Sequence, residues 1–237
     1  MAYLLELSSY KAGTMRRFAL LFLLLVLVGA LVATTHDVER RVSPADVNAA
    51  RRIMADAGQF GRRPANFAGE VALVRAVQDR VLDAAPVDKE IPEGQPRELA
   101  NLVMAGHGLC FDRSRAIETV LRLHGMETRH VAIYSEKETG SALRSLMTPG
   151  VESHAISEVK TRRGWMMVDS NVRWIGLTSD NHPIALAQLR ENPSATSPEI
   201  YRAPFTWVYG LYSRHGRFYP PYNAVPDVNW KELAENL

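Results

Sequence analysis

Three residues in the middle of the chain carry side chains that could together attack a carbonyl carbon. They are Cys110, which is the only cysteine among the 237 residues, His154 and Asp169. A thiolate is a strong nucleophile, a histidine can take up the proton of the thiol, and a carboxylate can fix the tautomer of that histidine. The chain therefore contains, in this order, a candidate nucleophile, a candidate base and a candidate orienting acid.

Cys110 is predicted to lie at the start of a helix. Residues 111–124 carry apolar side chains at spacings of three and four and are followed by Gly125, which is typical of a helix end. The partial positive charge at a helix N-terminus stabilises a thiolate. Gly106 and Gly108 would let the backbone turn sharply before the cysteine and approach a substrate closely.

His154 and Asp169 are predicted on two neighbouring strands of an antiparallel hairpin. A two-residue turn at 162–163 would pair Thr161 with Gly164. Because side chains alternate along a strand, this register places His154 and Asp169 on the same face, one diagonal step apart. A slip of one residue would put them on opposite faces, so the spacing permits the cluster without requiring it.

The elements around these residues predict one compact α+β domain. Apolar periodicity and capping residues indicate the helices, and segments with a period of two indicate the strands. The predicted helices are 43–57, ended by Gly58, then 69–85, 97–105 and 111–124, with a further turn or two at 184–189. The predicted strands are 128–134, 154–161 and 165–170, with another around Trp207 and Tyr209, and 135–153 is predicted to be a surface loop.

These segments resemble the transglutaminase-like superfamily of papain-like cysteine enzymes. The matching pieces are GHGLCFDRSRAIETVLRLHGMETRHVAIY at 106–134, SHAISEV at 153–159 and GWMMVDSN at 164–171. The resemblance implies a papain-like or transglutaminase-like core, in which the nucleophile helix packs on an antiparallel sheet. It also implies Cys110 as nucleophile, His154 as base and Asp169 as orienting acid. Members act on amide bonds, as transglutaminases, proteases or deglycosylating amidases, although some have lost the three residues.

The sequence departs from the pattern of the superfamily at positions that concern the substrate. Many members carry a Pro-aromatic pair after the aspartate, where this chain has Ser170 and Asn171. Many carry Trp after the histidine, where this chain has Ala155. These departures leave the three residues intact but weaken any transfer of substrate specificity.

Further residues are candidates for contacts with the reacting group. The backbone N–H of Cys110 is the natural first oxyanion donor, because it lies at a predicted helix N-terminus, and His107 or Asn101 could supply the second donor. Trp165 and Asn171 are candidates for contacts with the substrate.

Several of these residues also have an interpretation without catalysis or in another role. Cys110 could be an inert buried thiol, and Asp180 or Asn171 could act as the orienting group instead. Arg113 and Arg115, on the first turns of the nucleophile helix, could bind an acidic substrate or simply face solvent.

Composition excludes several classes of function. With 46% hydrophobic and 23% charged residues, the chain is neither wholly disordered nor collagen-like. A formal net charge of +2 is too balanced for a nucleic-acid binder that relies on electrostatics. His107 lies close to Cys110, but the chain has no second cysteine and no HExxH motif, so neither a metal site nor a cofactor is predicted.

An apolar block near the N-terminus predicts a membrane anchor. Residues 18–33 contain no charge or amide, and two threonines extend the run to residue 35. A spanning helix needs about 20 residues and tolerates about 17. The block is preceded by three basic residues, so the positive-inside bias keeps the N-terminus in the cytoplasm. These basic residues are Lys11, Arg16 and Arg17.

The apolar block divides the chain into segments with different predicted locations. They are a cytoplasmic segment 1–17, a transmembrane helix or signal anchor 18–35, and an extracytoplasmic domain 36–237 with core motifs at 106–171 and an aromatic-rich extension at 201–237. The alternatives for the block are a signal peptide cut near residues 28–30 or Ala33, and a buried helix. In the extension, residues 219–222 could rim a cleft, but aromatic residues more often close a core.

The sequence thus predicts a membrane-anchored cysteine enzyme of bacterial type. It would attack amide or ester bonds, form a thioester, and act as a protease, an amidase or an acyl transferase. It is predicted to cross the inner membrane once through residues 18–35, with its domain in the periplasm and a peptide, a protein or a cell-envelope polymer as substrate. The alternative is a non-catalytic, membrane-tethered binding module that reuses the same fold.

Overall fold

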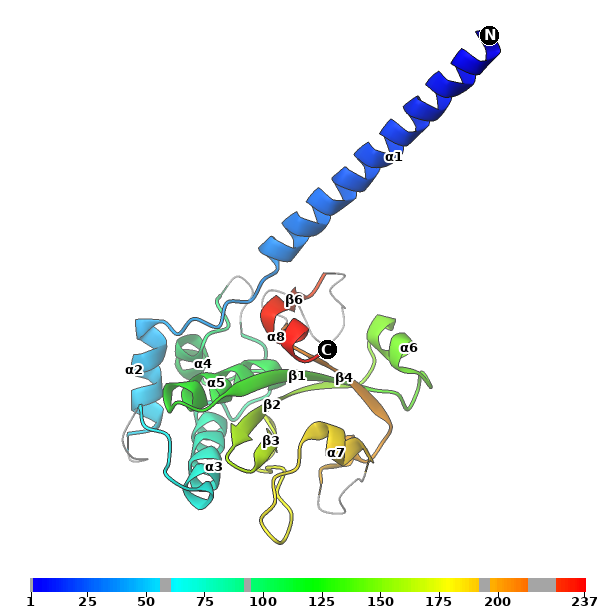
Figure 1. Cartoon of the computed structure of the whole chain (residues 1–237). Helices are drawn as coiled ribbons and strands as arrows, with labels where there is room; N and C mark the ends of the chain where they lie inside the picture. Colours follow the sequence, from blue (N-terminus) through cyan, green and yellow to red (C-terminus); the bar gives the residue numbers. More distant parts are fainter. Residues whose placement is uncertain (1, 56–60, 92–94, 192–196, 213–224) are drawn as a thin grey trace. The chain divides into compact units, whose positions relative to one another are not determined.

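The chain divides into two compact units, Met1–Asp37 and Val38–Leu237. The computed structural model describes residues 2–55, 61–91, 95–191, 197–212 and 225–237 (Figure 1). The first unit contains one long helix, and the second is the folded domain that carries Cys110, His154 and Asp169.

The first unit consists largely of helix α1 (Ala2–Thr35). Its part from Met15 to Thr35 has 21 residues and a mean hydropathy of 2.7, so it is long and apolar enough to cross a membrane. By length and composition, this confirms the predicted apolar helix at 18–35. The helix itself begins well before the apolar block.

Capping side chains explain where two helices of the domain begin. Ser43 accepts a hydrogen bond from the N–H of Asp46, and Asn66 accepts one from the N–H of Gly69. The helices ahead of the sheet are α2 (Pro44–Ile53), α3 (Phe67–Ala84), α4 (Leu99–Ala105) and α5 (Cys110–Leu123). Helix α2 is shorter than the predicted 43–57, and its predicted end, Gly58, lies outside the described residues.

Four strands form an antiparallel sheet in the order β3-β2-β1-β4 (Figure 1). They are β1 (Thr128–Ser135), β2 (Ser153–Thr161), β3 (Gly164–Val168) and β4 (Phe205–Tyr209). Thr161 pairs with Gly164, so the predicted turn and register of the hairpin are confirmed. The α+β architecture with a helix packed on an antiparallel sheet is confirmed as well, as is the strand at Trp207 and Tyr209.

Shorter elements complete the described part of the domain. The stretch 135–153, predicted as a surface loop, contains a helix, and the helical turns predicted at 184–189 are present. These elements are α6 (Ala142–Met147), α7 (Leu186–Glu191), the 3-10 helix η1 (Glu199–Tyr201), β5 (Leu211–Tyr212), β6 (Asp227–Val228) and α8 (Trp230–Glu235).

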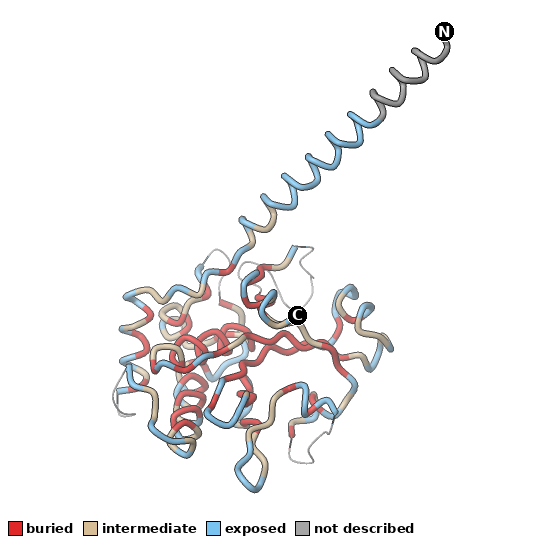
Figure 2. Tube along the Cα trace, in the orientation of Figure 1, coloured by how far each residue is buried: buried red, intermediate tan, exposed pale blue. Residues whose placement is uncertain are grey.

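The central strands and α5 are buried along most of their length (Figure 2). On one face of the sheet, Ile117 of α5 packs in a cluster with α3 and with Val159 of β2. On the other face, Ile156 of β2 packs with Leu186 of α7 and Tyr201 of η1. The alternation of side chains along β2 therefore sends neighbouring residues into two different apolar layers.

The aromatic residues of the C-terminal extension contribute to these layers. Tyr201, Phe205 and Tyr212 are all buried, so they help to close the core. The loop predicted at 219–222 lies outside the described residues.

The first residues of the domain are bonded to its C-terminal part. The N–H of Val38 donates to the carbonyl oxygen of Val228 (3.0 Å), and the side chain of Asn229 donates to the carbonyl oxygen of Val38 (2.8 Å). Arg40 donates to the carbonyl oxygen of Thr128 (2.6 Å) at the start of β1. The segment that follows Asp37 is therefore an integral part of the fold.

A buried contact between a histidine and a carboxylate links α5 to β1. Nδ1 of His130 lies 2.7 Å from Oε1 of Glu118, and the hydroxyl of Tyr212 donates to Oε2 of the same carboxylate (3.0 Å). Burial, the largest influence, raises the pKa of Glu118, but the charge and hydrogen bond of His130 and the charges of Arg122 and Arg40 outweigh it and lower the pKa to about 2. The pair therefore stabilises the fold only while Glu118 is ionised.

We expect Glu118 to make the domain sensitive to acid. Its pKa is lower in the folded than in the unfolded chain, whose value is near 4.5, so its contribution is present above pH 4.5 and is lost as the pH falls toward about 2. In Glu118→Gln, the free energy of unfolding should fall less between about pH 5 and about pH 3 than in the wild type. Urea unfolding of the full chain in detergent at both pH values measures this difference.

The control is Glu127→Gln, which removes a carboxylate from an exposed ion pair with Lys160. It should lose as much stability on acidification as the wild type. An unchanged acid response in Glu118→Gln would mean that the buried carboxylate does not have a lowered pKa.

Candidate active site

Cys110 is the first residue of α5 and follows a tight turn that depends on two glycines. Gly106 has a φ of 68° and ends α4 in the left-handed conformation that favours glycine. At Gly108, a Cβ would lie 2.6 Å from Cδ1 of Leu102 and 3.1 Å from Cβ of Asp112, so a larger residue would displace its neighbours. Both glycines therefore help to position the first turn of α5.

His154 lies between Cys110 and Asp169. Its Nε2 is 3.2 Å from Oδ2 of Asp169, and its ring also forms a hydrogen bond with Cys110. Because Nε2 faces the carboxylate, Nδ1 is the ring nitrogen left for the sulfur. Burial, the largest influence, lowers the pKa of His154, but the hydrogen bonds and charges of Asp169 and Cys110 outweigh it and raise the pKa to about 10. The imidazole is therefore held as an imidazolium at neutral pH.

The carboxylate of Asp169 is surrounded by donors. Oδ1 accepts the N–H groups of Asn171 (2.7 Å) and Val172 (2.9 Å), and Oδ2 faces His154 and accepts the hydroxyl of Tyr201. Burial, the largest influence, raises the pKa of Asp169, but the hydrogen bonds and charge of these partners, His154 first, outweigh it and lower the pKa. The donors thus hold an ionised carboxylate in one orientation.

All three residues are buried. Cys110 is 1% exposed, His154 4% and Asp169 2%. Cys110 belongs to an apolar cluster with Tyr134 of β1 and Val151, which lies just before β2. A substrate can therefore reach the sulfur only after side chains that pack around it have moved.

A comparison with protein families finds a match over the core of this site. Residues 63–170 match the family model of the transglutaminase-like superfamily. This segment is therefore similar to transglutaminase-like domains. The match contains Cys110, His154 and Asp169, and it supports the resemblance inferred from the motifs.

More distant comparisons add little. A chain in the crystal structure of Rad4–Rad23 bound to a 6-4 photoproduct UV lesion is similar at a TM-score of 0.35 and 11% identity. The alignment covers 86% of this chain but 49% of that one, so this chain spans about half its length. No curated protein matches the sequence.

Two residues that hold Asp169 were missed by sequence reasoning. Tyr201, which donates to its carboxylate, lies beyond the segment that matches the family model. The side chain of Gln78 on α3 donates to the carbonyl oxygens of Asp169 (2.7 Å), Val172 (3.0 Å) and Trp174 (2.7 Å). A signal for Gln78 was present, because it is an amide on the apolar face of its predicted helix.

The two predicted second oxyanion donors lie before Cys110 and have other partners. Nδ1 of His107 is 3.1 Å from the carbonyl oxygen of Lys89. The amide of Asn101, on α4, donates to the carbonyl oxygen of Pro96 (2.6 Å). The described bonds therefore tie both side chains to the connection between α3 and α4, not to the cluster.

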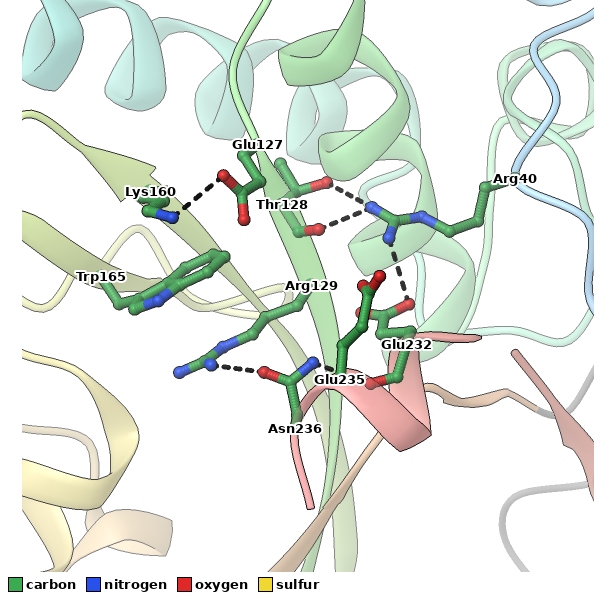
Figure 3. A pocket seen from close by; sticks show the side chains of 9 residues that line it. All are labelled: Arg40, Glu127, Thr128, Arg129, Lys160, Trp165, Glu232, Glu235 and Asn236. Carbon is green, nitrogen blue, oxygen red and sulfur yellow. Dashed lines mark hydrogen bonds and ion pairs between the residues drawn. The ribbon is translucent and has the colours of Figure 1, made fainter. Parts of the chain in front are cut away.

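Trp165 lies near the opposite end of β3 from Asp169, and the structure does not bring it to the cluster. Figure 3 shows it among the residues of another site. It lines a separate polar pocket of about 400 Å³. The guanidinium of Arg129 lies 4.1 Å from the centre of its indole ring, and Nζ of Lys160 lies 5.6 Å from it. Two cations thus flank the ring in this structure.

The remaining candidates occupy different places. Asn171 borders the cluster through its N–H bond to Asp169, whereas the exposed Asp180 pairs with His182 (2.8 Å) and is not the partner of His154. Arg113 and Arg115 are buried, so the expectation that they face solvent is wrong. Among the residues that the structure describes, no three His, Cys, Asp or Glu side chains group in a way that could hold a metal ion.

Proposed function

We propose that the domain is a cysteine enzyme that breaks an amide or ester bond through a thioester on Cys110. The continuous contacts from Cys110 through His154 to Asp169, at the N-terminal end of α5, carry this proposal. A cysteine beside an imidazolium and a helix N-terminus is activated as a nucleophile. The superfamily match over residues 63–170 supports the same reading.

In the first half-reaction, the sulfur of Cys110, present as a thiolate paired with the imidazolium of His154, attacks the carbonyl carbon. The C–N or C–O bond then breaks, and the leaving amine or alcohol takes the proton from His154. In the second half-reaction, water attacks the thioester and gives a proton to His154, and the C–S bond breaks, which restores the thiolate and the imidazolium. An amine in place of water yields a new amide. Asp169 stays ionised and keeps the ring aligned.

The backbone N–H of Cys110 is the first oxyanion donor in this proposal, because it lies in the first turn of α5. Of the two predicted second donors, His107 fits better than Asn101. His107 is three residues before Cys110 and has Nε2 in addition to the nitrogen that faces Lys89, whereas the amide of Asn101 is bonded to Pro96.

In this proposal, α1 anchors the chain in a bacterial inner membrane as a single span, with the domain in the periplasm. The span from Met15 to Thr35 is apolar, and the basic Arg16 and Arg17 at its start favour a cytoplasmic N-terminus. Peptides, proteins and cell-envelope polymers are the substrates that such a location offers.

The test is covalent labelling of intact membranes with a small electrophilic acyl analogue, followed by mass mapping. The wild-type chain should carry the label on Cys110, and Cys110→Ala should carry none. Equal labelling of the two proteins would refute nucleophilic catalysis. The same mass map reports whether the N-terminal helix is still attached.

A non-catalytic, membrane-tethered binding module is the second candidate, and the burial of Cys110 favours it. A binding module needs no access to the sulfur. In that case, native protein would resist even a small reagent such as iodoacetamide, and Cys110 would react only after unfolding. Labelling before and after denaturation therefore separates the two functions.

A further inference from the structure

The guanidinium of Arg113 joins parts of the domain that meet at Cys110. Arg113 lies one turn after Cys110 in α5 and is 3% exposed. Its Nε donates to the carbonyl oxygen of Ala85 (3.0 Å), Nη2 to Oδ1 of Asp88 (3.3 Å), and Nη1 to Oδ1 of Asn171. Three nitrogens of one buried cation therefore bind two segments, the connection that follows α3 and the turn after β3.

The segment around Asp88 supports the turn that precedes the nucleophile. The neighbouring Val87 forms a β-bridge with His107, and its carbonyl oxygen accepts the N–H of Gly108 (3.2 Å). This turn leads directly into Cys110, so the bond from Arg113 to Asp88 braces the approach to α5.

The bond to Asn171 leads to the orienting acid. The side chain of Asn171 accepts from Arg113, and its backbone N–H donates to Oδ1 of Asp169 (2.7 Å). Together with the contacts of Asp169 with His154 and of His154 with Cys110, these bonds close a ring. The ring leaves α5 at its first residue and returns to it one turn later.

We propose that Arg113 is a positioning residue for the Cys110 site, which sets the separation between the nucleophile helix and the turn that carries Asp169. This inference rests on the proposed function. Arg113 acts through Asn171 and Asp88 and has no described contact with Cys110 or His154. A planar guanidinium can bind three acceptors in fixed directions, which the single ammonium of lysine cannot do.

The experiment compares Arg113→Gln and Arg113→Lys with the wild type as full chains in detergent. The readout is the rate at which iodoacetamide alkylates Cys110, measured from about pH 5.5 to about pH 8.5. Over this range, the rate for an activated thiolate changes little with pH, whereas the rate for an ordinary thiol rises steeply. Because a displacement of about 1 Å can cost about 100-fold in rate, Arg113→Gln should alkylate at least about tenfold more slowly near pH 6 and show a steeper profile. Arg113→Lys should recover part of this loss.

The matched control is Arg115→Gln. Arg115 is also buried on α5, but it bonds Glu98 (2.7 Å) and the carbonyl oxygen of Glu39 (3.2 Å), outside the ring. Its replacement should lower stability and leave the pH profile unchanged. If Arg113→Gln also lowers stability without changing the profile, Arg113 has only a structural role and the inference is wrong.

Two further outcomes are informative. If Arg113→Gln does not fold, Asn171→Ala removes the same hydrogen bond at an exposed residue. This variant should make the pH profile steeper in the same way. An unchanged profile would overturn the inference. If the wild type itself shows the profile of an ordinary thiol, the proposed function fails, and the two failures are thereby distinguished.

Discussion

Replacing His154 with glutamine (His154→Gln) is expected to turn Cys110 into an ordinary thiol. In the wild type, the imidazolium of His154, whose pKa is raised to about 10, lies against the sulfur throughout the neutral range. The alkylation rate should therefore change little between about pH 6 and about pH 8. In the variant, the thiolate fraction, and with it the rate, should rise about tenfold per pH unit up to about pH 8.5.

The measurement is the rate of mass increase of the intact chain with iodoacetamide at several pH values. The slope of the rate against pH is the readout. Absolute rates are less informative, because a stabilised thiolate is more abundant but also less nucleophilic, and these two effects partly cancel. His124→Gln serves as the control, since His124 is another buried histidine, at the end of α5, and does not belong to the cluster. A wild-type rate that rises as steeply as that of His154→Gln would contradict an ion pair.

Replacing Asp169 with asparagine (Asp169→Asn) should nearly abolish reaction with the acyl analogue and should also destabilise the domain. The variant removes the charge opposite His154 and places an NH₂ group among donors from Tyr201, Asn171 and Val172. Loss of the orienting acid costs orders of magnitude in related chemistry, so a fall of at least about 100-fold is expected. A buried charge left without its partner costs about 3–5 kcal/mol of stability.

Labelling rates at neutral pH and urea unfolding of the full chain in detergent measure the two effects. Asp180→Asn is the matched control, because Asp180 was the rival orienting acid and is exposed, with His182 as its partner. It should change neither quantity. A labelling rate within a few-fold of the wild type in Asp169→Asn would show that the carboxylate has no part in the chemistry.

Local patterns were sufficient to predict the parts of the fold that depend on neighbouring residues. The two glycines and the apolar spacing placed the start of α5 within one residue of Cys110. The two-residue turn set the register of Thr161 with Gly164, and with it the shared face of His154 and Asp169. These features follow from periods of two and 3.6 residues, which the sequence displays directly.

Contacts between distant segments could not be predicted in the same way. Tyr201 is 32 residues from Asp169, and Gln78 is 91 residues from it, so their contacts depend on how whole layers pack. Arg113 was expected to bind an acidic substrate or to face solvent, because an arginine on a helix is usually paired or exposed at the surface. Its partner Asn171 lies 58 residues away, and no local pattern points to it.

The packing around Cys110 also protects the thiol from oxidation. With one cysteine, the chain can form a disulfide only with another molecule, and the sulfurs must approach to about 2 Å. A residue that is 1% exposed meets neither glutathione nor peroxide until the structure opens. In the proposed enzyme, each opening that admits a substrate would also admit an oxidant, so the frequency of opening would limit both the reaction and the lifetime of the reduced thiol.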